Sequence, residues 1–366
     1  MKSDIITPTL VLDVDRCKQN IQKMAKKAND SKVVFRPHFK THQSLEIGRW
    51  FKDANVQSIT VSSLRMAEYF SADWNDITVA FPVNILEIDL INILAKKITL
   101  NLLVESVETV QFLHDHLSDQ VGCFIKIDTG YNRTGVPSSK VDVLDELIHK
   151  MESSPKIHFK GFLSHSGHTY SCRTKKEIEA IYTAAGGAMN ILKKRYVNEF
   201  PNLILSYGDT PSCSIIEDFS DFDEIRPGNF VFYDITQSVI GSCQTNSIAV
   251  ALACPLVAIH KDRNELVIYG GGIHFSKDRV EENGKVIFGK VVERRGTKWG
   301  AQIDGMWVKS LSQEHGIIHC SPNKIDDFKV GDLLYVLPVH SCMTADLMKK
   351  YLTTDNNWID CMQLKY

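Results

Sequence analysis

The strongest constraint on the fold is an alternation of short apolar runs with longer helical stretches over about the first 235 residues. Eight of the runs have the length and the β-branched or aromatic content of strands. They cover residues 33–35, 58–61, 77–81, 98–104, 123–127, 159–163, 203–205 and 230–233. Eight strands that alternate with helices predict a parallel (β/α)8 barrel. A doubly wound open sheet is the alternative, but the glycine-rich turn typical of that fold does not follow the first strand.

The segments between these runs have helical periodicity. Apolar residues from Cys17 to Ala28 recur at spacings of three and four, so they share one face of a helix. Ser106 is placed to cap a second helix. We therefore expect helices near residues 17–28, 106–116, 141–151 and 174–196.

The pattern changes after about residue 240. Short β-branched runs at 247–250, 266–269, 306–308 and 333–336 are separated by turns, and helical patterns are nearly absent until Thr344. Short β-branched runs separated by turns predict a second, mainly antiparallel β domain. We therefore expect a barrel at residues 15–240 and a β domain at residues 241–366, with residues 1–14 as candidate members of the β domain.

Composition excludes several kinds of protein. The net charge of -2 argues against nucleic acid as the main partner, because phosphate binding needs a basic face. No stretch approaches the ~18 apolar residues of a membrane span, and the N-terminus lacks the apolar core of a signal peptide. The nine cysteines contain no CxxC pair, which is typical of reduced thiols. These features predict a cytoplasmic protein.

A barrel of this kind carries its active site where strands end and helices begin. The first strand runs into residues 36–42, which include His38, Lys40 and His42. On extended backbone these three side chains point the same way. Lys40 would then project into the barrel mouth, where neighbouring cations and desolvation lower the pKa of a lysine, as a Schiff-base nucleophile requires. A surface strand end with solvated charges is the alternative interpretation.

The next strand ends also carry polar residues. After the fifth strand, Arg133 lies between two glycines and would contact an anion or a ring oxygen, or simply be an exposed turn residue. After the sixth strand come His165, His168 and Tyr170. The two histidines could bind a metal, pack on a flat cofactor ring, or form hydrogen bonds in the core.

The loops after the seventh and eighth strands often bind a phosphate group in such barrels. Small residues there fit that role, although each alone is an ordinary turn residue: Gly208, Thr210, Ser212 and Gly228.

A separate pair of metal-binding residue types lies in the predicted β domain. His340 and Cys342 are two apart, and on extended backbone they would share one face and could chelate one ion. The thiolate favours zinc over magnesium or calcium. Water or substrate would supply the other ligands, as in a catalytic site, and chance proximity of the two residues is the alternative.

Taken together, these motifs resemble those of the D-serine dehydratase and D-threonine aldolase family of alanine-racemase-like pyridoxal phosphate enzymes. The similar segments occur in order along essentially the whole chain. They are residues 36–42, 128–135, 165–170, 208–212, 226–229, 312–316 and 338–342. The resemblance implies a barrel followed by a β domain, usually in a homodimer.

The resemblance also implies roles for individual residues. Lys40 would hold pyridoxal 5'-phosphate as a Schiff base and then act as the base on the substrate Cα. Arg226 would approach the pyridine nitrogen. The phosphate would be bound by Thr210, Gly228 and Asn229, and the ring and its phenolic oxygen would be surrounded by Tyr170, His165 and Arg133.

The choice of reaction depends on the predicted metal pair. Family members that dehydrate β-hydroxy D-amino acids tend to have His-x-Cys, as at His340 and Cys342, whereas the aldolases tend to have His-x-Asp. The resemblance therefore implies a zinc-dependent lyase that converts a small β-hydroxy D-amino acid such as D-serine to a 2-oxo acid and ammonia. Three alternatives stay open: an aldolase that releases glycine and an aldehyde, an amino-acid racemase, and a non-catalytic protein that binds the cofactor.

Overall fold

The computed structural model describes residues 5–363, which separate into two compact units. The barrel unit comprises Gln22–Lys40 and Gly48–Gly228. The β unit comprises Thr41–Ile47 and the described residues of Met1–Ile21 and Asn229–Tyr366. Two helices, α1 (Val14–Asp30) and α2 (Leu45–Lys52), contain residues of both units. Within residues 5–363, none of the helices combines the length and the apolar character needed to cross a membrane.

The barrel unit is built on eight parallel strands; from the second to the eighth, each is hydrogen-bonded to the next in chain order, and the first pairs with the eighth. They are β2 (Val34–Phe35), β3 (Ile59–Val61), β4 (Asp76–Pro82), β5 (Thr99–Val104), β6 (Val121–Asp128), β8 (Ile157–Ser164), β9 (Ile204–Tyr207) and β10 (Glu224–Ile225). A short strand, β7 (Val136–Pro137), pairs with the end of β6.

The first and last strands of this sheet are joined, which closes the barrel. β10 pairs with β2, and beyond β2 the chain pairs with β3 through a bridge between His38 and Thr60. The Thr60 N–H donates to Pro37 O and the Phe39 N–H donates to Thr60 O, both at 2.9 Å. The predicted (β/α)8 barrel is therefore confirmed.

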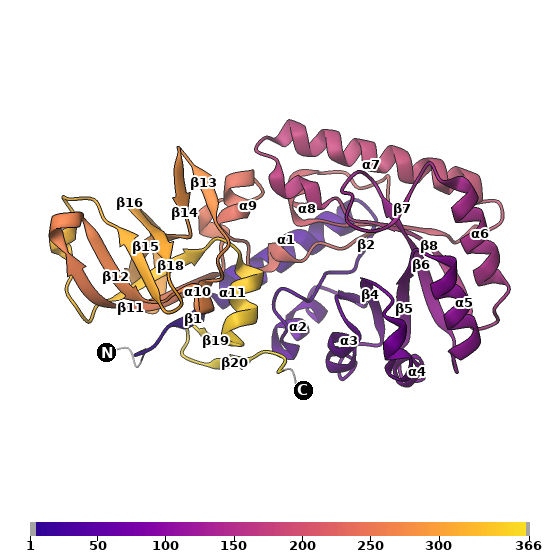
Figure 1. Cartoon of the computed structure of the whole chain (residues 1–366), viewed down its shortest axis with the longest axis horizontal. Coiled ribbons are helices and arrows are strands. Elements are labelled where there is room, and N and C mark those ends of the chain that lie inside the picture. The colour runs from indigo at the N-terminus through magenta and orange to yellow at the C-terminus, as the bar shows by residue number, and fades with distance from the viewer. Residues whose placement is uncertain (1–4, 364–366) are drawn as a thin grey trace. The chain divides into compact units, whose positions relative to one another are not determined.

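The helices predicted near residues 106–116, 141–151 and 174–196 begin within one residue of the expected position, whereas the helix predicted at 17–28 begins three residues earlier, at Val14. Figure 1 shows the longer ones along the outside of the parallel strands. Ser106 caps its helix by accepting from the Thr109 N–H, and Thr174 forms a capping box with Glu177. These helices are α3 (Leu64–Phe70), α4 (Ile88–Ala95), α5 (Val107–His116), α6 (Val141–Glu152), α7 (Lys175–Tyr196) and α8 (Thr210–Ile215), with short 3₁₀ helices at Ile85–Glu87 and Gly167–Ser171.

The eighth strand lies earlier in the chain than the sequence indicates. Residues 230–233, predicted as that strand, are not one: Asn229–Val231 forms a 3₁₀ helix, and the strand is β10. The N–H groups of Phe232 and Tyr233 both donate to Asn229 O, at 3.0 and 2.8 Å. The run is apolar because it lies in the core of the β unit, where the ring of Phe232 packs on Tyr351. A short buried apolar run has the same composition in either conformation.

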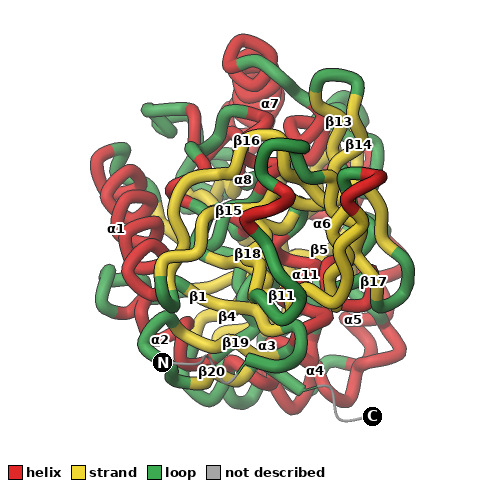
Figure 2. Tube along the Cα trace, turned by 90° about the vertical axis from the view of Figure 1, so that its left-hand side faces the viewer, coloured by secondary structure: helices red, strands yellow, loops and turns green. Residues whose placement is uncertain are grey.

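The β unit contains six antiparallel strands that close on themselves, since each pairs with the next and β11 also pairs with β12. In order they are β12 (Glu265–Tyr269), β17 (His315–His319), β16 (Lys298–Leu311), β15 (Gly289–Arg295), β18 (Leu333–Pro338) and β11 (Val250–His260). Figure 2 shows β15, β18 and β11 side by side. The predicted antiparallel β domain is therefore confirmed.

Further strands extend this sheet from β11, including the N-terminal strand. β1 (Thr9–Leu12) pairs antiparallel with β11, β19 (Lys350–Thr353) pairs parallel with β1, and β20 (Trp358–Asp360) pairs with β19. A separate hairpin consists of β13 (Val280–Glu282) and β14 (Lys285–Ile287). The predicted strand at 247–250 is wrong except for its last residue, because β11 begins at Val250 and Thr245–Ser247 is a 3₁₀ helix.

The helices of the β unit are short. They are α9 (Ile235–Ile240), α10 (Gly272–Phe275) and α11 (Ser341–Met348), with further 3₁₀ helices at Lys261–Arg263 and Ile325–Asp327. Asp234 caps α9 by accepting from the Gln237 N–H at 2.9 Å.

Candidate active site

A cluster of cationic side chains surrounds His165 in the barrel unit, just after β8. Removal from water lowers the pKa of His165 well below its usual value, and four nearby positive charges lower it further. Those charges belong to Lys40, Arg133, Lys126 and Arg226. His165 Nδ1 lies 2.5 Å from Gly208 O, and a carbonyl oxygen can only accept, so Nδ1 carries the hydrogen. The ring is therefore a neutral imidazole among four basic side chains.

Arg226 follows β10 and is held in one orientation by buried acceptors. Its Nε donates to Ser206 Oγ at 2.6 Å, and one terminal nitrogen donates to the backbone oxygens of Ser164 and Ser206. Burial lowers the pKa of the guanidinium to about 10, which still leaves it charged at neutral pH. A fixed cation of this kind fits the position beside a ring nitrogen that the resemblance implies.

Lys126 is a member of the cluster that the sequence analysis missed. It lies on β6 with 5% of its surface exposed, and its Nζ donates to Ile127 O at 3.0 Å. Burial lowers its pKa to about 7, assisted by the charges of Arg226 and Arg133. The available signal was a single lysine inside the apolar run of residues 121–127, where a charge is costly.

The backbone around Lys40 is not the extended strand end that the sequence analysis assumes. Extended structure ends at His38, and residues 39–42 form a turn. The alternation expected for His38, Lys40 and His42 is therefore wrong, because it holds only on a strand. His38 Nδ1 accepts from the Lys40 N–H at 3.3 Å, and the side chain of Lys40 is exposed.

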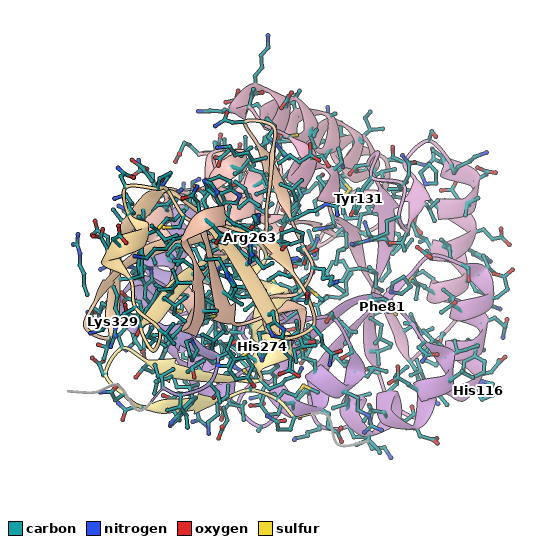
Figure 3. All side chains as sticks on the ribbon, turned by 60° about the vertical axis from the view of Figure 1, so that its left-hand side comes forward. Phe81, His116, Tyr131, Arg263, His274 and Lys329 are labelled. Carbon is teal, nitrogen blue, oxygen red and sulfur yellow. The ribbon has the colours of Figure 1, made fainter. Side chains whose placement is uncertain are left out.

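Arg133 and its neighbours form the loop after β6. The guanidinium lies 5.0 Å over the ring of Tyr131, which is labelled in Figure 3, and Tyr131 stacks on His168 with ring centroids 6.0 Å apart. The same tyrosine ring also meets His165 edge-on, with ring centroids 6.0 Å apart, so the two histidines share Tyr131 as an aromatic neighbour. Tyr170 lies half-buried in the 3₁₀ helix that follows β8.

The residues implied for phosphate binding lie at the ends of β9 and β10. The Gly228 N–H donates to the buried Thr210 Oγ1 at 3.4 Å. The side-chain amide of Asn229 donates to Asp234 at 2.6 Å and to Cys342 at 3.4 Å. Because that amide is already engaged, a phosphate contact from Asn229 would come from its backbone N–H.

The predicted metal pair meets in the β unit, although not on extended backbone. His340 is extended, as expected, but α11 begins at Ser341, so Cys342 lies in the first turn of a helix and the expected extended backbone is wrong for Cys342. His340 Nδ1 is 2.9 Å from Asp278 Oδ2. Burial alone would lower the pKa of His340, but hydrogen bonds to Asp278 and Cys342 raise it.

These donors fit the groups that the resemblance implies. Because the Asp278 carboxylate contacts Nδ1 of His340, the other ring nitrogen, Nε2, stays available to a metal held with Cys342. Many zinc sites pair a carboxylate with a ligating histidine in this way. Among residues 5–363, no three side chains of the types His, Cys, Asp and Glu are placed to hold one metal ion together. Water or substrate would therefore complete the coordination. The four basic side chains around His165 fit a cofactor that carries a phosphate dianion and a phenolic oxygen.

A closed (β/α)8 barrel with cations collected where its strands end, joined to an antiparallel β unit, defines the alanine-racemase-like class of proteins. Residues 12–235 match the family model described as "Alanine racemase, N-terminal domain", and residues 249–354 match that described as "Putative serine dehydratase domain". Within that class, the chain belongs to the D-serine dehydratase and D-threonine aldolase family.

Individual relatives match over nearly their whole length. The D-serine dehydratase of Dictyostelium discoideum is 28% identical, over 97% of this chain and 95% of that protein. The structure of D-threo-3-hydroxyaspartate dehydratase from Delftia sp. HT23 superposes with a TM-score of 0.91, at 24% identity and 99% coverage of both chains. An alanine-racemase-like protein from Idiomarina loihiensis gives a TM-score of 0.86 at 28% identity, covering 97% of this chain and 96% of that one.

Proposed function

We propose that the protein is a pyridoxal phosphate- and metal-dependent dehydratase. It eliminates water from a β-hydroxy D-amino acid such as D-serine and yields a 2-oxo acid and ammonia. The observation that carries this proposal is the His340–Cys342 pair, with Asp278 behind the histidine, in a chain that also carries the cofactor-lysine motif. Relatives named as dehydratases of D-serine and of D-threo-3-hydroxyaspartate support it.

The residues of the barrel unit have distinct tasks in this reaction. Lys40 holds the cofactor covalently and later accepts the Cα proton at Nζ. Arg226, held by Ser206, would present a fixed positive charge to the ring nitrogen, and His165, held by Gly208 O, would pack against the cofactor as a neutral ring without adding charge. When bound, pyridoxal phosphate supplies the electron withdrawal that makes the Cα proton acidic.

The remaining barrel residues orient the cofactor. Arg133 and Tyr170 lie on the loops after β6 and β8 and would contact the phenolic oxygen. Thr210 and Gly228, with the backbone of Asn229, bind the phosphate. Fixing both ends of the cofactor keeps its reactive carbon within reach of Lys40.

His340 Nε2 and Cys342 Sγ would hold the metal, for which we propose zinc because one donor is a thiolate. Hydroxide is a poor leaving group, and the Lewis acidity of a bound zinc ion would stabilise it as it departs. Asp278 fixes the histidine so that Nε2 stays available. The structure of a cysteine-to-alanine variant of a D-threo-3-hydroxyaspartate dehydratase is described as a metal-free form, which is consistent with a metal site in that protein.

Product analysis tests the proposal. The cofactor-loaded protein is incubated with D- and L-serine, D- and L-threonine and the isomers of 3-hydroxyaspartate, with zinc or after chelation by EDTA. We expect ammonia and a 2-oxo acid from a D-amino acid, with loss of turnover after EDTA and recovery on adding zinc. Cys342→Ala should abolish the zinc response, whereas the exposed-site variant Asp262→Asn should retain it.

Other products would point to other reactions. Glycine and an aldehyde from D-threonine would make the protein an aldolase. Inversion of a D-amino acid that survives EDTA would make it a racemase, and bound cofactor without turnover would make it a binding protein.

The proposal includes a homodimer and a cytoplasmic location. Light scattering on the purified protein measures the first, and fractionation of cells measures the second. A monomer that is fully active would contradict the dimer.

A further inference from the structure

The sulfur of Cys342 has hydrogen-bonding neighbours from two distant parts of the β-unit sequence. Thr41 Oγ1 lies 3.2 Å from Cys342 Sγ, and Asn229 Nδ2 lies 3.4 Å from it. Both side chains are buried, with 0% of Thr41 and 4% of Asn229 exposed. Sulfur hydrogen bonds are longer than those to oxygen, so both separations are contacts rather than chance proximity.

The direction of the Asn229 contact is fixed by its other partner. Asn229 Nδ2 is 2.6 Å from Asp234 Oδ2, and an ionised carboxylate can only accept, so the NH₂ group faces Asp234. Its second hydrogen points between Ser341 Oγ, 3.1 Å from Nδ2, and Cys342 Sγ. Asp234 is itself held by the Ser341 N–H at 3.0 Å, one residue before the cysteine. The amide is thus anchored on the same turn that carries the sulfur.

The direction of the Thr41 contact follows from the state of the sulfur. A metal ligand must be a thiolate, which has no proton to donate. The Thr41 hydroxyl therefore donates when a metal is bound. The sulfur then receives one O–H and one N–H bond, both from buried groups.

We propose that Thr41 and Asn229 are positioning residues for the metal-binding thiolate: they hold Cys342 Sγ in one orientation and withdraw charge from it. This inference rests on the proposed function, because it takes His340 and Cys342 as the metal ligands. Donors to a ligating group orient it and tune the metal. A thiolate that gives less charge to its metal leaves the metal a stronger Lewis acid, which suits the departure of hydroxide.

Chain connectivity gives Thr41 a second significance. It follows Lys40 directly, and both belong to the turn of residues 39–42. One turn of four residues therefore supplies the lysine assigned to the cofactor and the hydroxyl assigned to the thiolate.

The test compares Thr41→Val, which removes the hydroxyl, with Thr41→Ser, which keeps it. The resident metal of the full-length, cofactor-loaded protein is exchanged for Co²⁺. Two quantities are measured: the Co²⁺ dissociation constant by competition with a chelator, and the sulfur-to-cobalt charge-transfer band in the difference spectrum against metal-free protein. Neither depends on turnover.

We expect Thr41→Val to bind Co²⁺ about tenfold more weakly, because the sulfur loses a group that holds it in one orientation. The band should shift to longer wavelength, because a thiolate that loses a donor is more electron-rich. Thr41→Ser should stay within about twofold of the unaltered protein. Unchanged affinity and an unchanged band in Thr41→Val would overturn the inference. Equal losses in both variants would also overturn it, because they would assign the effect to the threonine methyl group.

The same measurement separates this inference from the proposed function. If the unaltered protein shows no sulfur-to-cobalt band, or Cys342→Ala shows the same band, then the metal assignment itself is wrong and the inference fails with it. If the band is present and depends on Cys342, but not on Thr41, the metal assignment stands and only the positioning role is lost.

Discussion

Arg226 donates a hydrogen bond from Nε to Ser206 Oγ over 2.6 Å, and the Ser206 hydroxyl donates in turn to Glu224 Oε1 over 2.6 Å. Glu224, on β10, also accepts from Nε of Arg36, which follows the neighbouring strand β2. One hydroxyl therefore links the arginine assigned to the cofactor ring with a buried ion pair of the barrel interior. The orientation of Arg226 therefore depends on Ser206 and, through its hydroxyl, on Glu224.

Glu224→Gln should destabilise the protein by about 3 kcal/mol, because it leaves the buried Arg36 without its full counter-charge. Arg36 keeps a second partner, Asp76, at 2.7 Å, which places the expected loss at the low end of the range for a broken buried pair. Urea unfolding measures the change. The exposed pair Glu293–Arg295 offers the control, because Glu293→Gln should cost less than about 1 kcal/mol. Equal losses in the two variants would contradict the role of Glu224.

Lys126 should make stability depend on pH. Its pKa in the folded chain is about 7, below the unfolded value of 10.5, so between these values the unfolded chain binds a proton that the folded chain does not. Stability of the cofactor-free protein relative to Lys126→Met should therefore rise as pH rises from 7 to 10, by up to ~1.4 kcal/mol per pH unit. Denaturant unfolding at several pH values measures the difference.

A matched lysine supplies the control for this pH effect. Lys96 is exposed, so Lys96→Met should show a flat difference from the unaltered protein over the same pH range. If the difference in unfolding free energy between the unaltered protein and Lys126→Met is also independent of pH, then the folded chain does not disfavour the charged form of Lys126.

Lys40→Ala should lower activity by about 10³-fold or more, since it removes both the covalent link to the cofactor and the base on Cα. Borohydride treatment of the unaltered protein, followed by peptide mass spectrometry, should locate the cofactor on the peptide that contains Lys40. Lys96→Ala should retain both activity and labelling. Labelling of another lysine in the unaltered protein would overturn the assignment.

Asp278→Asn should weaken metal binding by about 10- to 100-fold, because the carboxylate fixes the ring of His340 and increases its basicity. Ser276 Oγ donates to Asp278 at 3.0 Å, so the carboxylate is itself held in place. Competition with a chelator measures the affinity, and Asp262→Asn, at an exposed position, serves as the control. Unchanged affinity in Asp278→Asn would show that the histidine needs no support from this carboxylate.

Local sequence was sufficient for the helices at 107–116, 141–152 and 175–196 and for seven of the eight barrel strands. Ser106 and Thr174 mark helix starts because an N-cap depends on residues only two or three positions away. The fold class followed from the same kind of information, since strands and helices each have their own apolar period. The candidate residues at strand ends could be found because a barrel places its site at that edge.

Tertiary structure decided the position of the eighth strand, the turn at Lys40, the burial of Lys126, and the engagement of the Asn229 amide by Asp234 and Cys342. It also decided the pairing of Asp278 with His340 and of Thr41 with Cys342, which are 62 and 301 residues apart. The physical reason is one of range. Periodicity and capping report interactions within a few residues, whereas these hydrogen bonds and the low polarity around Lys126 exist only once the chain has brought distant segments together.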